Sequence, residues 1–238
     1  MAGESAKAHV GFLVSGVCLA FLMVFLGACL HMRTTAQASP DPHDVAAERG
    51  CPVDWSFWKS VNPDVVGWIT IAGTPVDYPV VQAHASDPTF YLSHDVYGRP
   101  NVYGCPYIDA ACEAQGGTRA PCVVVFGHHM SDGSMFAAFA NFAEEGYLLA
   151  HRTITLHTPA STRTFQAQAA AVVPGRQPSK RVEFASQADL ANFLLARTGA
   201  SDVNVSDHDD VVRQSQAFAF VTCSYSRWSD ERTVVYAW

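Results

Sequence analysis

A cysteine ends an apolar run near the C-terminus. The run Phe218–Val221 leads through Thr222 into Cys223, and the polar residues Ser224 and Tyr225 follow it. The end of a strand holds a side chain on a rigid support, and a cysteine thiolate is a strong nucleophile. Cys223 is therefore a candidate nucleophile, and the alternative is a buried structural cysteine or one half of a disulfide.

Two adjacent histidines follow a second apolar run. Cys122–Phe126 is typical of a buried strand, and Gly127, His128 and His129 come directly after it. Side chains alternate between the two faces of a strand, so continued extended geometry would point the two imidazoles in opposite directions. This disfavours a metal site that uses both histidines and favours one functional histidine beside one bystander. The alternative for His128 is a purely structural role.

An arginine precedes the last apolar run of the chain. Arg232 lies nine positions after Cys223 and is followed by Thr233–Trp238. A hairpin formed by the strands before Cys223 and after Arg232 would place these two side chains next to each other. The alternative is a surface arginine paired with Asp230 or Glu231, an interaction that contributes little to stability.

The segments that must position these residues are mostly strand-like. Val65–Ile71 and Val76–Gln82 predict two strands joined by a tight turn at 72–75. The further strand-like runs are Cys122–Phe126, Thr153–His157, Thr164–Val173, Ala217–Thr222 and Thr233–Trp238. Because few long helices separate these runs, the pattern favours a mainly β fold, either a barrel or a sandwich, with helical insertions.

Helices are predicted in three segments. Asp44–Lys59 contains helix-forming patches that are broken at Pro52, which predicts two short helices. Ser134–Phe142 carries an apolar stripe at helical spacing, and Ser186–Thr198 begins with a capping-box-like pair, Ser186 and Asp189. We interpret the apolar stripes of these segments as core packing and not as ligand sites.

The N-terminal region contains a candidate membrane span. From Val10 to Leu30 the chain carries no charged residue, and about 20 such residues suffice for a helix to cross a bilayer. The alternatives are a cleaved secretory signal and a lipoprotein signal at Cys29. All three place the C-terminal part outside the cytoplasm. The predicted organisation is a short cytoplasmic N-terminus at 1–9, a transmembrane signal-anchor at 10–30, a linker at 31–43 and an extracytoplasmic domain at 44–238.

The chain has seven cysteines. Two of them lie in the apolar N-terminal run, and those outside it are Cys51, Cys105, Cys112, Cys122 and Cys223. In an oxidising location four of these could form two disulfides and leave one free thiol. Cys105 and Cys112 are near enough in sequence to close a short loop. The absence of a C-x-x-C pair argues against a structural zinc site, and we expect neither a metal nor a cofactor.

The composition excludes several functional classes. Hydrophobic residues make up 49% of the chain and charged residues 16%, unlike a disordered protein. The formal net charge is −7, and Lys and Arg do not cluster anywhere in the sequence. Nucleic-acid binding requires a basic surface, so nucleic acid is not an expected partner. The same charge argues against electrostatic adhesion to an acidic membrane.

These motifs, taken in order, resemble the sortase family and most closely its class B branch. The resemblance covers about Asp54 to Tyr236. Asn62–Ile69 with Val76–Gln82 is similar to the paired first strands of class B members, and Phe126–Met130 with Asp132–Phe136 is similar to the segment of the catalytic histidine. Thr222-Cys223 matches the end of the T-L-x-T-C motif, and Arg232–Val235 matches the strand that bears the arginine of the family.

Two features depart from the family pattern. Ala219 and Phe220 stand where the motif has Thr and Leu, at positions that we interpret as packing positions. The region from Cys105 to Cys122 is longer and richer in cysteine than the family leads us to expect.

The resemblance implies a fold and a site. The fold is a closed β-barrel of about eight strands with N-terminal helices and helical insertions. Cys223 is then the nucleophile, His128 the general acid and base, and Arg232 the group that steadies the substrate and the oxyanion. The residues beside the nucleophile, Thr222, Ser224 and Tyr225, are expected to contact the substrate.

The reaction implied by the resemblance is transpeptidation. The enzyme would cleave a C-terminal sorting signal after Thr, form a thioacyl-enzyme, and transfer the protein to an amine of the cell wall or of a pilin. Its expected partners are surface proteins that bear the signal, an acceptor amine on a cell-wall precursor or pilin, and the membrane through the N-terminal helix. The segment 174–216 corresponds to the loop with which family members grip the signal. We expect a single-pass protein of the cell membrane with its sortase-like catalytic domain outside the cytoplasm.

Two alternatives remain at this point. One is a cysteine endopeptidase that acts mainly by hydrolysis, because water and an amine compete for the same thioester. The other is a non-catalytic, membrane-anchored β domain that binds at the cell surface. A disulfide between Cys223 and Cys105, Cys112 or Cys122 would favour the second alternative, because no nucleophile would remain.

Overall fold

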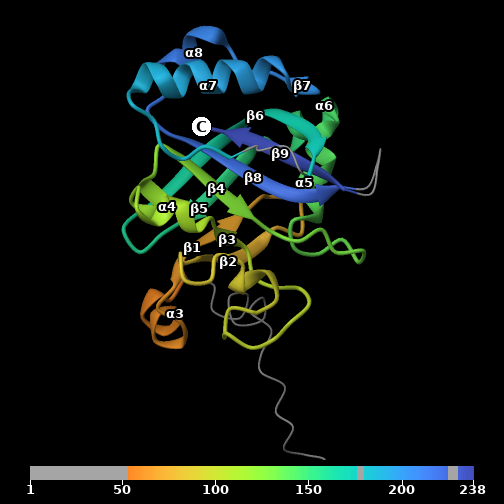
Figure 1. Cartoon of the computed structure of the whole chain (residues 1–238). Coiled ribbons are helices and arrows are strands. Elements are labelled where there is room, and N and C mark those ends of the chain that lie inside the picture. The colour runs from red at the N-terminus through yellow and green to blue at the C-terminus, as the bar shows by residue number, and fades with distance from the viewer. Residues whose placement is uncertain (1–52, 176–179, 225–229) are drawn as a thin grey trace, which may run out of the picture. The chain divides into compact units, whose positions relative to one another are not determined.

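The computed structural model describes residues 53–175, 180–224 and 230–238 (Figure 1). The strands of this part are β1 (Val65–Thr70), β2 (Asp77–Gln82), β3 (Tyr107–Ile108), β4 (Cys122–Phe126), β5 (Thr153–His157), β6 (Thr162–Pro174), β7 (Val203–Asn204), β8 (Ala217–Ser224) and β9 (Glu231–Ala237). The α-helices are α3 (Trp55–Val61), α4 (Ala110–Glu113), α5 (Ala137–Ala140), α6 (Glu145–Ala150), α7 (Gln187–Gly199) and α8 (His208–Arg213). Short 3-10 helices are η1 (Phe90–Leu92), η2 (Gly117–Arg119) and η3 (Asn141–Ala143).

The strands form one sheet that closes on itself. Their order is β5-β1-β2-β3-β4-β8-β9-β6-β7, and a further pairing of β5 with β6 closes the ring. Eight strands therefore make a barrel, and β7 is attached to β6 outside it. The pairs β2–β3 and β4–β8 are parallel, and the other pairs are antiparallel. The closed β-barrel expected from the resemblance is confirmed.

Aromatic side chains fill much of the core. Phe220 of β8 contacts Phe136 and Phe139, with ring centroids 6.4 and 5.0 Å apart, and Phe139 stacks on Phe142. These contacts seat the segment of α5 and η3 against β8. Removing such large side chains from water is the main favourable contribution to folding.

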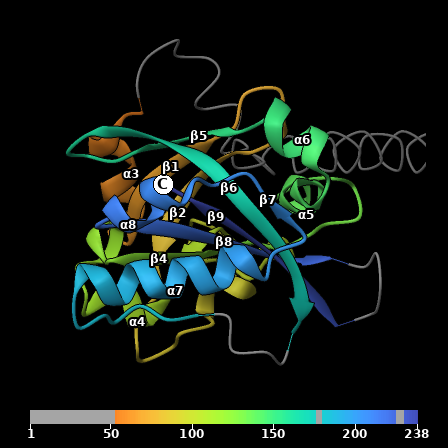
Figure 2. The same cartoon turned by 90° about the horizontal axis from the view of Figure 1, so that it is seen from above.

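Helices α7 and α8 pack against each other beside the barrel (Figure 2). The capping prediction is confirmed, because the Ser186 side chain accepts a hydrogen bond from the backbone N–H of Asp189 and the helix starts at Gln187. Leu190 and Leu194 are buried, as the apolar stripe predicted. At the other end of the described region, α3 starts at Trp55, and the helix predicted before Pro52 lies outside the described residues.

The helix predicted at Ser134–Phe142 is wrong in its first turn. Helix α5 begins only at Ala137, and η3 continues from it. Met135 has a φ of 57°, in the left-handed region that a helix cannot include, and the hydroxyl of Tyr78 accepts a 2.9 Å hydrogen bond from its backbone N–H. A tertiary contact therefore overrides the local apolar pattern.

The strand predictions are confirmed for β1, β2, β4, β5, β6, β8 and β9, with shifts of one to two residues at several ends. Strands β3 and β7 were not predicted. Each has two residues, which is too short for a period-two pattern to be visible.

The cysteines that the structure describes are free thiols. Cys105, Cys112 and Cys122 are buried, whereas Cys223 is partly exposed. The short loop that Cys105 and Cys112 could have closed is not formed. The Cys105 sulfur lies 3.7 Å from the carbonyl oxygen of Pro79, and the Cys112 sulfur lies 3.8 Å from that of Cys122. Cys51 is outside the described residues.

The predicted signal-anchor at 10–30 also lies outside the described residues. Within the described ranges, no helix has the length and apolar character needed to cross a membrane.

Candidate active site

Cys223 and Arg232 lie directly opposite each other on neighbouring strands. They are paired residues in the antiparallel register of β8 and β9, which confirms the predicted juxtaposition. Residues opposite each other in such a pair project from the same face, with Cβ atoms about 4.5–5.5 Å apart. The Nη1 of Arg232 donates a 2.9 Å hydrogen bond to the carbonyl oxygen of Glu231, which helps to fix the guanidinium. The register thus places an arginine on the same face of the sheet as the thiol.

Glycine at position 175 leaves room for this guanidinium. A Cβ at Gly175 would lie 3.3 Å from Cζ of Arg232 and 2.7 Å from the carbonyl oxygen of Asp230. The backbone N–H of Gly175 donates to that same carbonyl at 2.6 Å. The end of β6 therefore packs closely against the start of β9.

The two histidines follow β4, which runs parallel to β8. Phe126 pairs with Val221, and the backbone N–H of Gly127 donates to the Val221 carbonyl at 3.1 Å. This register brings His128 and His129 alongside the end of β8. A side chain at position 127 would overlap the ring of Phe136, so glycine is required there.

The histidines bind different carbonyl groups. The Nε2 of His128 lies 2.7 Å from the carbonyl oxygen of Leu92, and the Nδ1 of His129 lies 2.8 Å from that of Cys223. A carbonyl oxygen only accepts hydrogen bonds, so each of these nitrogens carries a proton. In its neutral form His128 therefore keeps Nδ1 as the basic nitrogen, the atom that can receive or return a proton.

His129 is more than the bystander that the sequence predicted, because its imidazole holds the backbone of the candidate nucleophile. The sequence signal was present in the adjacent histidines at the end of β4. It could not be interpreted without the β4–β8 register, which brings position 129 to the Cys223 carbonyl.

The loop after the histidines is closed by its own backbone. The N–H of Phe136 donates to the carbonyl of His128 at 2.7 Å, and His129 and Met135 form an isolated β-bridge. Asp132 accepts a hydrogen bond from the Ser134 hydroxyl, which is the main cause that lowers the pKa of the Asp132 carboxyl. The Tyr103 hydroxyl donates to the same carboxylate at 2.8 Å and connects this loop to the one that contains Leu92.

A further glycine, Gly104, lies against the imidazole of His128. Gly104 has a φ of +60°, and a Cβ there would lie 2.5 Å from the Tyr91 carbonyl oxygen, 3.0 Å from that of Leu92 and 3.2 Å from Cδ2 of His128. Only glycine allows the backbone to approach the histidine this closely. Gly104 was not identified from the sequence.

Burial separates Cys223 chemically from the other described cysteines. Loss of solvation raises the pKa of the Cys112 thiol to about 11 and of the Cys122 thiol to about 12, and it also raises the pKa of Cys105. These three groups stay neutral thiols at physiological pH. Cys223 is the partly exposed one, as a nucleophile must be.

Tyr107 of β3 is an electrostatic neighbour of Cys223. Burial is the main cause that raises the pKa of its hydroxyl to about 12, and Asp109 and Cys223 contribute in the same direction. The Tyr107 ring packs on Phe126, with centroids 5.5 Å apart. A neutral phenol therefore stands near the thiol.

The residues predicted to contact the substrate have different positions. Thr222 and Ser224 are buried, and their hydroxyl groups find no hydrogen-bond partner within the part of the chain that the structure describes. By strand alternation they project from the face opposite to Cys223. Tyr225 lies outside the described residues. Substrate contact by these three residues stays a prediction.

Comparisons with known proteins point to one family. A scan against protein-family models gives no match. Sortase B of Listeria monocytogenes is 32% identical over 97 residues, which is 41% of this chain and 38% of that protein. Sortase B of Staphylococcus aureus is 26% identical over 161 residues, which is 66% of this chain and 64% of that protein. The chain thus aligns with less than two thirds of either curated relative.

Solved structures extend the likeness over the described barrel. The crystal structure of Clostridium perfringens sortase B matches with a TM-score of 0.67 and 25% identity, and the match covers 76% of this chain and 97% of that one. A complex of Staphylococcus aureus sortase B with substrate matches with a TM-score of 0.66 and 25% identity, covering 76% of this chain and 82% of that one. Together with the barrel and the pairing of Cys223 with Arg232, these likenesses show that the chain is similar to class B sortases in sequence and in fold.

Proposed function

We propose that this chain is a cysteine transpeptidase that uses Cys223 as its nucleophile. The observation that carries the proposal is the position of a partly exposed free thiol opposite Arg232, with His128 at the end of the adjacent strand. A free thiol titrates near pH 8.5, so about a few per cent is thiolate at neutral pH. A guanidinium that stays protonated favours the thiolate without competing for its proton.

The first half-reaction is acylation. The Cys223 sulfur attacks the carbonyl carbon of a peptide bond, and Arg232 donates hydrogen bonds to the oxygen on which negative charge develops. His128 gives a proton to the departing amine, so the C–N bond breaks as the thioester remains on the enzyme.

The second half-reaction returns the enzyme to its starting state. An incoming amine loses a proton to His128 as its nitrogen attacks the thioester, and Cys223 leaves as the thiol or thiolate. In both half-reactions Nδ1 of His128 carries the proton, because Nε2 donates a hydrogen bond to the Leu92 carbonyl.

We infer that the substrate is a C-terminal sorting signal cleaved after Thr, and that the acceptor is an amine of a cell-wall precursor or of a pilin. A related sortase B is known as a substrate complex, which supports a peptide signal as the substrate class. Residues 10–30 would anchor the enzyme at the cell membrane, where both substrates are present.

The segment that follows β6 is our candidate for signal selectivity. The Nζ of Lys180 lies 2.7 Å from the carboxylate of Asp109, which also caps α4. Arg181 pairs with Asp189 in the first turn of α7. These two ion pairs connect adjacent residues of the segment to Asp109 beside the barrel and to the start of α7, which supports it as a substrate-gripping element.

The decisive experiment is intact-protein mass spectrometry with a small panel of signal peptides. We expect a thioacyl adduct on Cys223 that an added amine converts into a new peptide product. Cys223→Ala should give no adduct, whereas Cys112→Ala, which removes a buried thiol, should keep it. Absence of an adduct with every peptide would contradict the enzyme assignment. An adduct that only water releases would instead support a hydrolase.

A further inference from the structure

We propose that Tyr91 is a positioning residue for the general acid and base: it anchors the turn whose Leu92 carbonyl holds Nε2 of His128. The proposal rests on the proposed role of His128 and extends it to a residue outside the catalytic centre. It explains how the tautomer of His128 is set.

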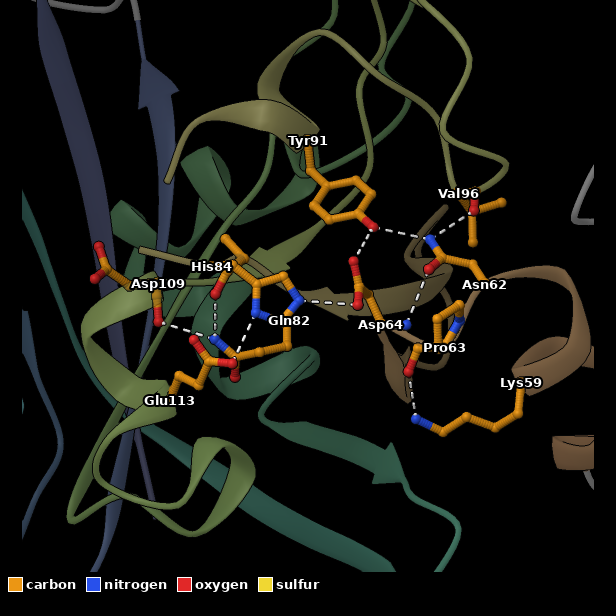
Figure 3. A network of polar contacts seen from close by, with 11 residues as sticks. Lys59, Asn62, Pro63, Asp64, Gln82, His84, Tyr91, Val96, Asp109 and Glu113 are labelled. Carbon is orange, nitrogen blue, oxygen red and sulfur yellow. Dashed lines mark hydrogen bonds and ion pairs between the residues drawn. The ribbon is translucent and has the colours of Figure 1, made fainter. Parts of the chain in front are cut away.

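The Tyr91 side chain is fixed at its hydroxyl. It is 3% exposed, and its hydroxyl donates a 2.6 Å hydrogen bond to Oδ2 of Asp64 and accepts one of 2.9 Å from Nδ2 of Asn62 (Figure 3). Both partners lie just before β1, so the barrel itself supports them. A hydrogen bond to a carboxylate is among the stronger ones in proteins.

Further contacts hold the partners of Tyr91. The Nδ2 of Asn62 also donates to the Val96 carbonyl at 2.9 Å, and its Oδ1 accepts from the backbone N–H of Asp64 at 2.9 Å. His84 lies between two carboxylates, with Nε2 2.9 Å from Asp64 and Nδ1 2.7 Å from Glu113 (Figure 3). Asp64 is therefore shared by Tyr91 and His84, whereas Glu113 contacts only His84 in this network.

A single turn connects Tyr91 to the histidine. Tyr91 and Leu92 belong to η1, and Tyr91 is the one residue of this turn that is buried. The backbone N–H of Cys105 donates to the Tyr91 carbonyl at 2.9 Å, and Gly104 packs against both carbonyls of the turn and against His128. The Leu92 carbonyl belongs to the last residue of η1, and the Tyr91 hydroxyl connects η1 to Asn62 and Asp64, which lie just before β1.

Loss of the hydrogen bonds of the Tyr91 hydroxyl should change the tautomer of His128 without unfolding the protein. If the Leu92 carbonyl shifts, Nε2 loses its acceptor, and the neutral imidazole divides between two tautomers. Only one of them has Nδ1 as the base. Misplacing a catalytic group by about 1 Å can cost a hundredfold in rate, so we expect a loss of roughly tenfold to a hundredfold.

The test is Tyr91→Phe, which removes one oxygen atom and keeps the ring. We expect kcat to fall about tenfold or more with KM changed less than about twofold, and the limb of the pH–rate profile that reports His128 to move. Imidazole ¹⁵N chemical shifts should show a single tautomer in the parent protein and a mixture in the variant. The ¹⁵N spectrum is recorded without any reaction. It therefore tests whether Tyr91 sets the tautomer of His128 even if the proposed function is wrong.

Two variants of the His84 partners form a matched pair. Asp64→Ala and Glu113→Ala each remove one carboxylate from His84, but only Asp64 contacts Tyr91. We expect Asp64→Ala to reproduce the tautomer mixture, because no acceptor for the Tyr91 hydroxyl remains at position 64, and Glu113→Ala to leave the His128 spectrum and kcat unchanged. Asp64→Ala also replaces the first test should Tyr91→Phe not fold.

Tyr236→Phe is the control for losing a buried hydroxyl elsewhere, because Tyr236 is 2% exposed and lies on β9 away from η1. A folded Tyr91→Phe variant with the parent tautomer and pH profile would overturn the proposal. So would an equal effect of Glu113→Ala or of Tyr236→Phe.

Discussion

The Nδ1 of His129 lies 2.8 Å from the carbonyl oxygen of Cys223, so the residue after the proposed base holds the backbone of the proposed nucleophile. His128 and His129 thus act on the same site in different ways. One would move protons, and the other fixes the end of β8. Two adjacent histidines can do this because alternation along the extended chain sends their side chains to different carbonyl groups.

Substitution of His129 tests this structural role. We expect His129→Ala to lower the free energy of unfolding by about 1 kcal/mol, the usual net contribution of one hydrogen bond, and to lower kcat/KM about fivefold. His129→Asn should retain most activity, because an amide N–H can donate to the same carbonyl. Denaturant unfolding and peptide-cleavage kinetics measure the two effects. An equal loss of activity in His129→Ala and His129→Asn would show that the hydrogen-bond donor at position 129 does not cause the effect.

Gly104 should tolerate no side chain. Gly104→Ala adds a methyl group at a φ of +60° that would meet two carbonyl oxygens and His128. We expect a loss of stability of about 1–3 kcal/mol and a loss of activity beyond that caused by unfolding. Gly98→Ala is the matched control, since its φ is +72° and nothing lies within 4 Å of the added carbon. Comparable activity in the two folded variants would contradict close packing against His128.

His84 should make stability depend on pH. Hydrogen bonding to Asp64, with a further contribution from Glu113, raises the pKa of its imidazole above the usual 6.5. A raised pKa in the folded state means that His84 stabilises the protein fully below pH 6.5, and that this contribution is lost as the pH rises through the folded-state pKa. The effect should be below about 1 kcal/mol, because the ion pairs are partly exposed.

The measurement is denaturant unfolding of the parent protein and His84→Asn at pH 5.5 and 8.5. We expect the variant to be less stable than the parent at the lower pH and to approach it at the higher pH. His157→Asn is a control, because His157 is bonded to the neutral hydroxyl of Thr162. A stability difference that is the same at both pH values would rule out a contribution from His84 protonation.

Alkylation should distinguish Cys223 from the other described cysteines. We expect iodoacetamide to label Cys223 in the folded protein and to leave Cys105, Cys112 and Cys122 unlabelled, because burial keeps their thiols neutral and inaccessible. All four should react after unfolding without reductant. Peptide mapping measures both states. A Cys223 that reacts only after reduction would mean that it is held in a disulfide.

The sequence alone predicted the features that depend on local patterns. Runs of apolar residues located the main strands, and Ser186 located the start of α7. Cys223, His128 and Arg232 became candidates because each stands at the edge of a strand-like run, and the resemblance to sortases assigned their roles. A hairpin links Cys223 to Arg232 over a short separation, so their pairing could be anticipated.

Tertiary structure alone decided how the site is held. The hydrogen bonds of His128 to Leu92 and of His129 to Cys223 join residues 36 and 94 positions apart, and no local pattern encodes such contacts. The close approach of Gly104 and the left-handed Met135 arise from the same packing. Local side-chain preferences determine where strands occur. The closure of the barrel determines which backbone groups face each histidine, because that depends on how all the strands pair.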